Sequence, residues 1–168
     1  LVYFKRRSSS LYMLTEHPMV ESYRGVRKAI ERTLCTYYAV ELMRNFTAEG
    51  APCPELYDQL VQSLWRFAHG RNLGLTVLFL EIGCLRDYGV LPTFDLCAEC
   101  GCELRTGGRL TFSASHGGPL CRPCAQEIHH RPGASMPVRG RRLRALASLC
   151  VHPPERMEEV SMRPKEIV

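Results

Sequence analysis

The chain has 168 residues, of which 45% are hydrophobic, and a formal net charge of +5. This composition excludes an intrinsically disordered chain, and the length suits one domain or one domain with a small satellite. No apolar run approaches the roughly 20 residues needed to span a membrane, and no secretory signal pattern occurs, so we predict a cytoplasmic protein. Arginine supplies 19 of the 22 basic residues. Because guanidinium groups form bidentate contacts with phosphate, this charge is compatible with a nucleic-acid partner.

The first fifteen residues are predicted to form two strands. Apolar residues 1–4 and 11–14 flank the polar stretch 5–10, which is the pattern of a hairpin. No initiator methionine precedes the first run, and we expect the chain to begin within a strand. Because an isolated pair of strands is only marginally stable, this pair should pack on another part of the protein.

Three helices are predicted next, over residues 24–46, 54–68 and 73–88. In each of them apolar residues recur at three- and four-residue spacing, the period of a helix with one buried face. Pro54 suits the first turn of the second helix, and Gly89 suits a left-handed stop after the third. Trp65 and the tyrosines are expected to belong to the core. The expected inward positions are Val26, Ile30, Leu34, Tyr37, Tyr38 and Leu42, then Leu56, Leu60, Val61, Leu64 and Phe67, then Leu75, Leu78, Phe79, Ile82 and Leu85.

Two Cys-x-x-Cys pairs, separated by twenty residues, form the strongest motif in the chain. This is the spacing of a four-thiolate zinc site, whose ligands would be Cys97, Cys100, Cys121 and Cys124. Glycine pairs bound a short predicted strand at residues 109–113, as a small zinc-ribbon-like β module over residues 95–125 requires. We predict one structural Zn²⁺ ion, and an iron–sulfur cluster is the alternative for four thiolates.

The cysteine motif argues against catalysis, because a zinc ion with four cysteine ligands leaves no open position for water or substrate. No phosphate-binding loop, nucleophile elbow or zinc-protease motif occurs either, so we predict that the protein is not an enzyme. Cys102 follows Cys100 closely, but the two pairs complete a ligand set without it. The remaining cysteines are odd in number and lie among apolar residues, which indicates reduced thiols. His116, His129 and His130 are expected to be surface histidines.

Residues 131–138 have the composition of a linker, and a final helix is predicted over residues 140–150, with Leu143, Leu146, Ala147 and Cys150 on one side. Its first turn is rich in arginine, although the helix macrodipole favours anions there. The arrangement is favourable if phosphate groups lie nearby. We therefore predict DNA contact by Arg139, Arg141, Arg142 and Arg144, and also by the basic turn Lys5, Arg6 and Arg7.

Three stretches of the chain resemble the RecO family of bacterial recombination mediators, over roughly residues 1–150. The first is Tyr38-Ala39-Val40-Glu41-Leu42, similar to a Tyr-x-x-Glu-Leu motif of the family. The second runs from Phe79 through Glu81-Ile82-Gly83 to Tyr88-Gly89-Val90-Leu91-Pro92 and leads into Cys97-x-x-Cys100-Gly101. The third is Phe112-Ser113 followed by Gly117-Gly118-x-x-Cys121-x-x-Cys124.

The resemblance implies a mainly α fold: a helical domain with an inserted zinc module, preceded by an OB-fold barrel. Residues 1–15 would be the remnant last strands of the barrel, residues 16–94 the helical domain, residues 95–125 the zinc module, and residues 126–168 a C-terminal helical segment that looks shortened.

The resemblance also implies a function without an enzymatic step. Such proteins bind single- and double-stranded DNA, anneal complementary strands and, with RecR, help RecA replace the single-strand binding protein (SSB), whose C-terminal tail is a further expected partner. We therefore expect a nucleoid-associated protein without a membrane partner. The alternatives are a protein-interaction scaffold with a structural zinc site and no DNA binding of its own, and a zinc enzyme with only three cysteine ligands.

Overall fold

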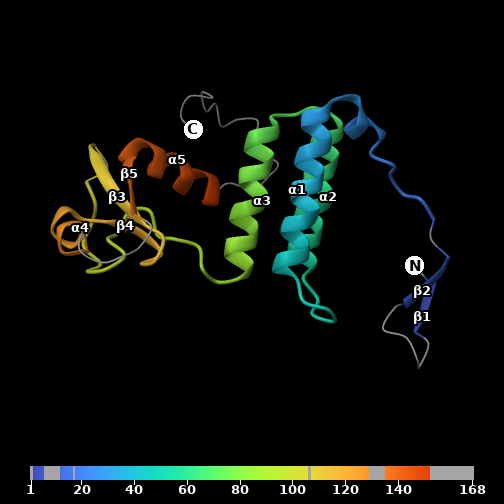
Figure 1. Ribbon diagram of the computed structural model, residues 1–168, viewed down its shortest axis with the longest axis horizontal. Coiled ribbons are helices and arrows are strands. Elements are labelled where there is room, and N and C mark those ends of the chain that lie inside the picture. Colours follow the sequence, from blue (N-terminus) through green and yellow to red (C-terminus); the bar gives the residue numbers. More distant parts are fainter. Residues whose placement is uncertain (1, 6–11, 17, 106, 129–134, 152–168) are drawn as a thin grey trace.

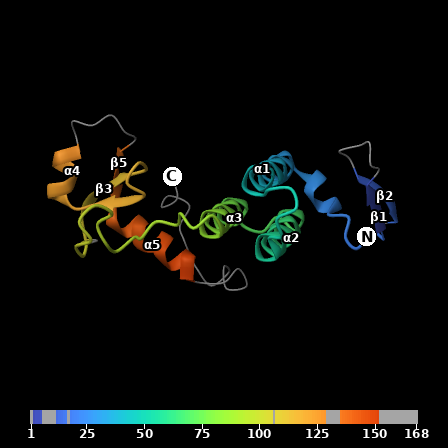
Figure 2. The same ribbon diagram turned by 90° about the horizontal axis from the view of Figure 1, so that it is seen from below.

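The computed structural model describes residues 2–5, 12–16, 18–105, 107–128 and 135–151. Along the chain, a hairpin is followed by three helices, a small sheet with a short helix, and a final helix (Figure 1). Two views at right angles place the hairpin at one end and the small sheet at the other, with the three consecutive helices between them (Figures 1 and 2). Within these residue ranges, no helix is both long enough and apolar enough to cross a membrane.

The predicted strand pair is confirmed for the described residues. Strands β1 (Val2–Lys5) and β2 (Tyr12–Glu16) are antiparallel, and Phe4 lies opposite Met13. Residues 6–11, which include the predicted polar turn, lie outside the described residues.

The first predicted helix begins later than expected. Residues 24–28 form a 3₁₀ helix, η1 (Arg24–Lys28), and Ala29 is extended, so the α-helix α1 covers only Ile30–Phe46. Tertiary contacts hold η1 in this position: the Arg32 guanidinium donates hydrogen bonds to the carbonyl oxygens of Gly25 and Ala68. A β-carbon on Gly25 would lie 2.0 Å from the Ala68 oxygen. The close approach of η1 to the end of the next helix therefore overrides the helical periodicity.

The second and third helices match their predictions closely. Helix α2 spans Pro54–Ala68 and buries Leu56 and Phe67, while α3 spans Leu73–Asp87. The Asn72 side chain caps α3 by accepting a hydrogen bond from the Leu75 amide. Gly89 has the left-handed conformation that was expected after this helix, with φ of 70°.

The predicted inward positions of the first helix are confirmed for Val26, which is buried in η1, and for Leu42, which packs against the core, but they are wrong for the others. Ile30, Leu34 and Tyr37 are 66%, 59% and 71% exposed, and the helix instead buries Ala39 and Met43 against α2 and α3. Both faces of α1 carry apolar residues, and the small Ala39 side chain allows the neighbouring helices to approach closely. The expectation that Trp65 and the tyrosines are core residues is also wrong for five exposed rings: Trp65, Tyr37, Tyr38, Tyr57 and Tyr88.

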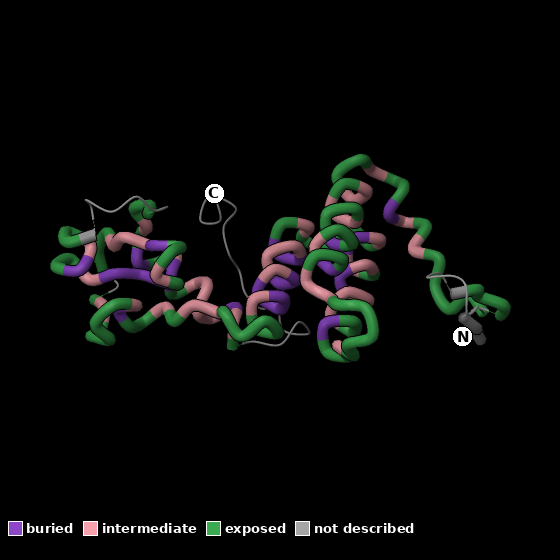
Figure 3. Tube along the Cα trace, turned by 60° about the horizontal axis from the view of Figure 1, so that its bottom comes forward, coloured by how far each residue is buried: buried purple, intermediate pink, exposed green. Residues whose placement is uncertain are grey.

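Helix α3 joins two parts of the core. One of its faces contributes Leu80 and Cys84 to the cluster with α1 and α2. Its other face contributes Phe79 and Ile82 to a cluster with Leu149 of helix α5 (Gly140–Val151). The final predicted helix is thus confirmed, although Leu149 was not among its expected inward residues. Figure 3 shows buried residues along α3 and within the small sheet.

The small sheet has the strand order β4 (Gly118–Leu120), β3 (Arg109–Ser113), β5 (Ser135–Arg139), with a short helix α4 (Arg122–Ile128) beside it. The predicted strand at residues 109–113 is confirmed. The linker prediction is wrong for residues 135–138, which belong to β5, and residues 131–134 lie outside the described residues. Pro137 is tolerated because β5 is an edge strand, where a missing amide donor costs little.

Candidate metal centre and arginine groove

The first cysteine pair lies in a tight turn of the backbone. The Cys97 carbonyl accepts a hydrogen bond from the Gly101 amide at 2.9 Å, and the Cys97 amide donates to the Cys102 carbonyl at 2.8 Å. Gly101 takes a left-handed φ of 70°, which glycine adopts without steric cost. The bridge between Leu96 and Glu103 closes the turn. This local geometry turns both side chains of the pair toward the same side.

The second pair is placed by a strand and a helix. Cys121 follows β4 directly, and Cys124 lies in the first turn of α4. The Ala98 amide donates a hydrogen bond to the Pro119 carbonyl at 2.8 Å, which ties the first turn to β4. Cys97, Leu120 and Cys124 form a buried cluster, so the module has only a very small core of its own.

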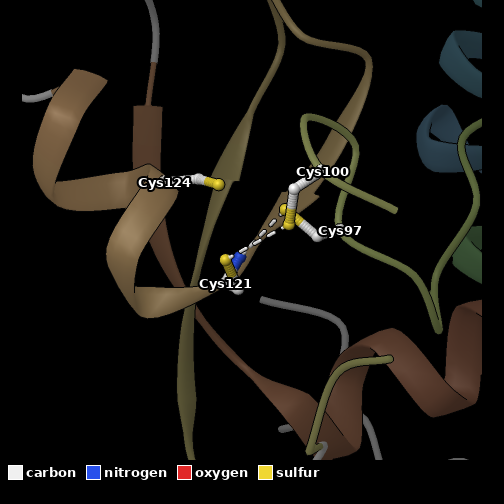
Figure 4. Close-up of side chains that lie close together, drawn as sticks. All are labelled: Cys97, Cys100, Cys121 and Cys124. Atoms are coloured by element: carbon white, nitrogen blue, oxygen red, sulfur yellow. Dashed lines mark hydrogen bonds between the residues drawn. The ribbon is translucent and has the colours of Figure 1, made fainter. Parts of the chain in front are cut away.

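All four predicted cysteines meet at one point. Their sulfur atoms lie within 4.8 Å of one another, and the Cys100 and Cys121 sulfurs are 3.7 Å apart. A tetrahedral zinc ion with Zn–S bonds of about 2.3 Å requires sulfur atoms about 3.8 Å apart. Figure 4 shows the four side chains directed toward a common centre from the turn, the strand end and the helix. The donor set therefore fits a metal that prefers four thiolates.

The environment of Cys97 favours its thiolate form. Burial raises the pKa of Cys97, but hydrogen bonds from the backbone of Cys100, Cys121 and Glu99 outweigh burial and lower the pKa to about 6. The Cys121 amide lies 3.3 Å from the Cys97 sulfur as one of these donors. Since metals bind the thiolate form, this environment favours coordination at neutral pH.

Two neighbours of the cluster do not belong to it. Cys102 is exposed and lies outside the group of four sulfurs. His116 is also outside that group, and it is not the surface histidine that was expected, because its side chain is only 19% exposed. Its Nδ1 atom lies 2.8 Å from the Ser113 hydroxyl, and its Nε2 atom lies 3.8 Å from Glu99. Ser113 is only 1% exposed, which argues against a catalytic hydroxyl. Instead, the contacts from Ser113 through His116 to Glu99 link the β3–β4 turn to the first cysteine pair.

A groove rich in arginine lies where the sheet passes into α5. Four arginines and the backbone of Gly107, Gly108 and Gly140 enclose a volume of about 390 Å³. We call this feature the arginine groove and define it by Arg109, Arg139, Arg141 and Arg144. A second hollow of about 390 Å³ shares Arg109 with the groove and includes Arg122, so the positive charge continues along the sheet.

The groove contains some, but not all, of the residues predicted to contact DNA. Arg139, Arg141 and Arg144 line it, whereas Arg142 does not. The Arg142 Nε atom is buried and has no hydrogen-bond partner among the described residues. Lys5 ends β1, far along the chain, and Arg6 and Arg7 lie outside the described residues.

Sequence reasoning missed Arg109. It lies in the strand that was predicted, but its position beside Arg139 depends on β5, which was interpreted as a linker. The glycine pair before Arg109 was taken only as a turn. In the structure these glycines form a wall of the groove, and the Gly108 carbonyl accepts a hydrogen bond from the Gly140 amide at 2.9 Å.

Comparison with known proteins gives the family. A model described as "Recombination protein O C terminal" matches residues 27–167. The chain is 32% identical over 130 residues to the DNA repair protein RecO of Anaeromyxobacter sp. (strain Fw109-5), covering 77% of this chain and 50% of that protein. It is 32% identical over 120 residues to the RecO of Myxococcus xanthus, covering 71% and 48%, and 31% identical over 117 residues to that of Bacillus pumilus, covering 70% and 44%.

These matches cover most of this chain, and the chain spans about half the length of the relatives. The matched region includes the helical bundle, the four cysteines and the arginine groove. The resemblance seen in the three sequence stretches is therefore confirmed, and the chain belongs to the RecO family.

Proposed function

We propose that this chain acts in DNA repair and recombination as a non-enzymatic mediator that binds single- and double-stranded DNA. In this role the arginine groove holds phosphate groups of the DNA backbone. The observation that carries the proposal is the pairing of Arg109 directly opposite Arg139 in the antiparallel sheet. Like charges in this position are destabilising, so the arrangement makes sense when an anion lies between them.

The start of helix α5 also favours phosphate in the groove. The helix begins at Gly140 in the groove lining, where the positive end of its dipole attracts anions, although the Gly140 amide itself donates to the Gly108 carbonyl. Arginine offers several donors in a fixed planar fork, which matches the oxygens of phosphate. Contacts of this type position a protein on DNA without reading its sequence.

The metal in this proposal is one structural Zn²⁺ ion held by Cys97, Cys100, Cys121 and Cys124. The ion would tie the two cysteine turns together and so support the sheet that carries Arg109 and Arg139. Metal binding would supply folding free energy to a module with a very small apolar core. The four thiolates leave no coordination position for a substrate, which supports a structural role.

The wider activity follows the family. We propose that the full protein anneals complementary single strands and, with RecR, helps load RecA onto DNA coated with SSB, whose C-terminal tail it contacts. Annealing requires neutralised phosphates and accessible bases rather than a nucleophile. In this proposal β1 and β2 are the last strands of an OB-fold barrel, and the protein is cytoplasmic and associated with the nucleoid.

The test is DNA binding by the 168-residue chain with paired replacements. Arg141→Ala combined with Arg144→Ala should weaken binding to single- and double-stranded DNA by similar factors, because phosphate contacts are blind to sequence. Arg44→Ala removes one exposed arginine in the last turn of α1, away from the groove, and is the control. If wild-type chain showed no DNA affinity at low salt, DNA binding by this chain would be rejected.

A protein-interaction scaffold is the second candidate, and the apolar face of α1 favours it. Ile30, Leu34 and Tyr37 leave a row of large apolar side chains uncovered, as a protein-binding helix would. A pull-down with the acidic SSB tail, set beside the DNA-binding assay, separates the two functions. Tail binding without DNA binding would favour the scaffold.

A further inference from the structure

Trp65 is the single tryptophan of the chain, and it is partly accessible to solvent. It is 43% exposed on α2, and it stacks on the His69 ring with a centroid distance of 4.1 Å and an interplanar angle of 27°. The His69 Nδ1 atom lies 2.8 Å from the Trp65 carbonyl oxygen, which fixes the pair one helical turn apart. The structure therefore holds a flat aromatic surface in a defined orientation.

A groove runs beside this ring and has a second aromatic wall. Trp65, Val61 and Tyr23 line it, with Gln62 and Arg66 also present, and its volume is about 550 Å³. Its lining is mainly apolar. This groove is separate from the arginine groove, because it lies on α2 and the segment before η1 rather than on the small sheet.

Tyr23 is held in place by a strained backbone. Its φ of 44° is left-handed, a conformation that a bulky residue rarely adopts. The Glu21 carboxylate accepts hydrogen bonds from the amides of Ser22 and Tyr23, and the Tyr23 carbonyl accepts one from Val26. Strain of this kind persists when the surrounding structure imposes it, and it is often found at binding sites.

The groove lining carries one acidic and one basic side chain, Glu21 and Arg66, and a basic stretch of chain follows directly after Tyr23. Arg24, Arg27 and Lys28 of η1 are exposed immediately after Tyr23, and Arg66 lies in the groove itself. Glu21 is the acidic residue of the lining, and one of its oxygens is already engaged by backbone amides. A ligand of this site should therefore combine a flat apolar ring with a negative group.

We infer that this groove takes an unpaired base of single-stranded DNA between Trp65 and Tyr23, with its phosphates directed toward the basic residues of η1. This inference rests on the proposed DNA binding and adds a base-stacking site to the phosphate contacts of the arginine groove. Stacking on aromatic side chains tolerates every base, because each base has a π face. The bases of an intact duplex are stacked on one another, so the groove distinguishes single strands from duplex.

Tryptophan fluorescence tests the inference directly, since every tryptophan photon comes from this groove. The 168-residue chain is titrated with a poly-dT strand and with a duplex of equal length, and binding is followed in parallel by anisotropy of a labelled strand. Poly-dT should quench the emission in step with binding, and the duplex should bind with little quenching. Trp65→Leu should lower the affinity for poly-dT by about tenfold, the effect of losing one aromatic stacking contact.

Three variants separate stacking from folding. Trp65→Phe keeps an aromatic face and should retain most of the poly-dT affinity, while Tyr23→Leu should lose it as Trp65→Leu does. Tyr88→Leu removes a 63% exposed ring at the end of α3 that does not line the groove, so it should change neither affinity. Duplex affinity should be the same in all of them.

The outcomes distinguish this inference from the function on which it rests. If poly-dT bound with unchanged emission, the stacking site would be wrong and DNA binding would stand. If neither DNA bound at low salt, both would be wrong. If a short acidic peptide with apolar residues changed the emission and poly-dT did not, the groove would be a peptide site and the inference would be overturned.

Discussion

Arg109 and Arg139 are cross-strand partners at the end of the pair formed by β3 and β5, and both side chains line one groove. Two positive charges in this position repel each other across a short distance. Helix α5 begins at the next residue, Gly140, where the positive end of its dipole adds to the repulsion. The folded protein keeps this unfavourable arrangement, and an anion in the groove would relieve it.

Reversing one of the two charges should therefore separate stability from binding. In Arg109→Glu a cross-strand ion pair with Arg139 replaces the repulsion, and the free energy of unfolding should rise by about 0.2–1 kcal/mol. DNA affinity should fall in the same variant. Urea denaturation and fluorescence anisotropy measure the two effects. Arg105→Glu makes the same charge change at an exposed position outside the groove and serves as the control.

The cysteine cluster predicts different results for two cysteines that are close in sequence. Cys100→Ser removes one of the four converging sulfurs, so the purified chain should lose its bound metal and its module should unfold at lower temperature. Cys102→Ser should keep about one metal ion per chain, because a tetrahedral four-cysteine site is complete without it. Metal analysis by mass spectrometry and a zinc-release assay provide the measurements. Loss of metal in Cys102→Ser would contradict this ligand set, because it would make Cys102 a ligand.

A hydrogen bond between α1 and α3 predicts that the stability of the protein falls at alkaline pH. The Tyr38 hydroxyl donates to the Glu81 carboxylate, and this bond, together with burial, raises the pKa of Tyr38 from 10.0 to about 12. Because the folded-state pKa is the higher one, the stabilisation is present below pH 10 and is lost as the pH rises through about 12.

Tyr38→Phe should lower the free energy of unfolding at neutral pH by about 1 kcal/mol, the net value of one hydrogen bond. It should also flatten the loss of stability between the two pKa values. Urea unfolding across that pH range measures both effects, with Tyr37→Phe as the control on the exposed side of α1. An unchanged alkaline profile in Tyr38→Phe would show that the bond contributes nothing in solution.

Two glycines predict opposite effects of the same substitution. In Gly25→Ala the new methyl group would lie 2.0 Å from the Ala68 carbonyl oxygen, so η1 must move away from α2, at a cost of about 1–3 kcal/mol. In Gly74→Ala the methyl group meets nothing within 4 Å near the start of α3, and stability should rise by about 0.5–1 kcal/mol. Thermal unfolding of the two variants compares them. Equal effects would contradict the packing of η1 on α2.

The helices and the cysteine cluster could be predicted because their determinants are local. Cys-x-x-Cys spacing brings two sulfurs together within one turn, and the structure unites all four predicted cysteines. The apolar period of α2 and α3 identified buried residues such as Phe67 and Phe79. Gly89 follows the end of α3 in a left-handed conformation, and the preference of glycine for this position can be recognised from the local sequence.

Features that depend on distant partners were not predictable in the same way. Helix α1 has apolar residues on two sides. The apolar period predicted that the side with Leu34 is buried, whereas the structure buries the side with Ala39. Strand β5 contains Pro137, and only its edge position beside β3 makes that residue acceptable. Because β5 was missed, the meeting of Arg109 with Arg139 was missed too.

The salt dependence of DNA binding tests most directly whether the arginine groove binds phosphate. Each phosphate that the protein neutralises releases counterions, so the salt dependence grows with the number of phosphate contacts. On a plot of log affinity against log salt concentration, Arg141→Ala with Arg144→Ala should reduce the magnitude of the slope by about 2, one for each arginine. Arg44→Ala should leave the slope unchanged. A slope equal to that of the wild type in the double variant would contradict a phosphate-binding role for the arginine groove.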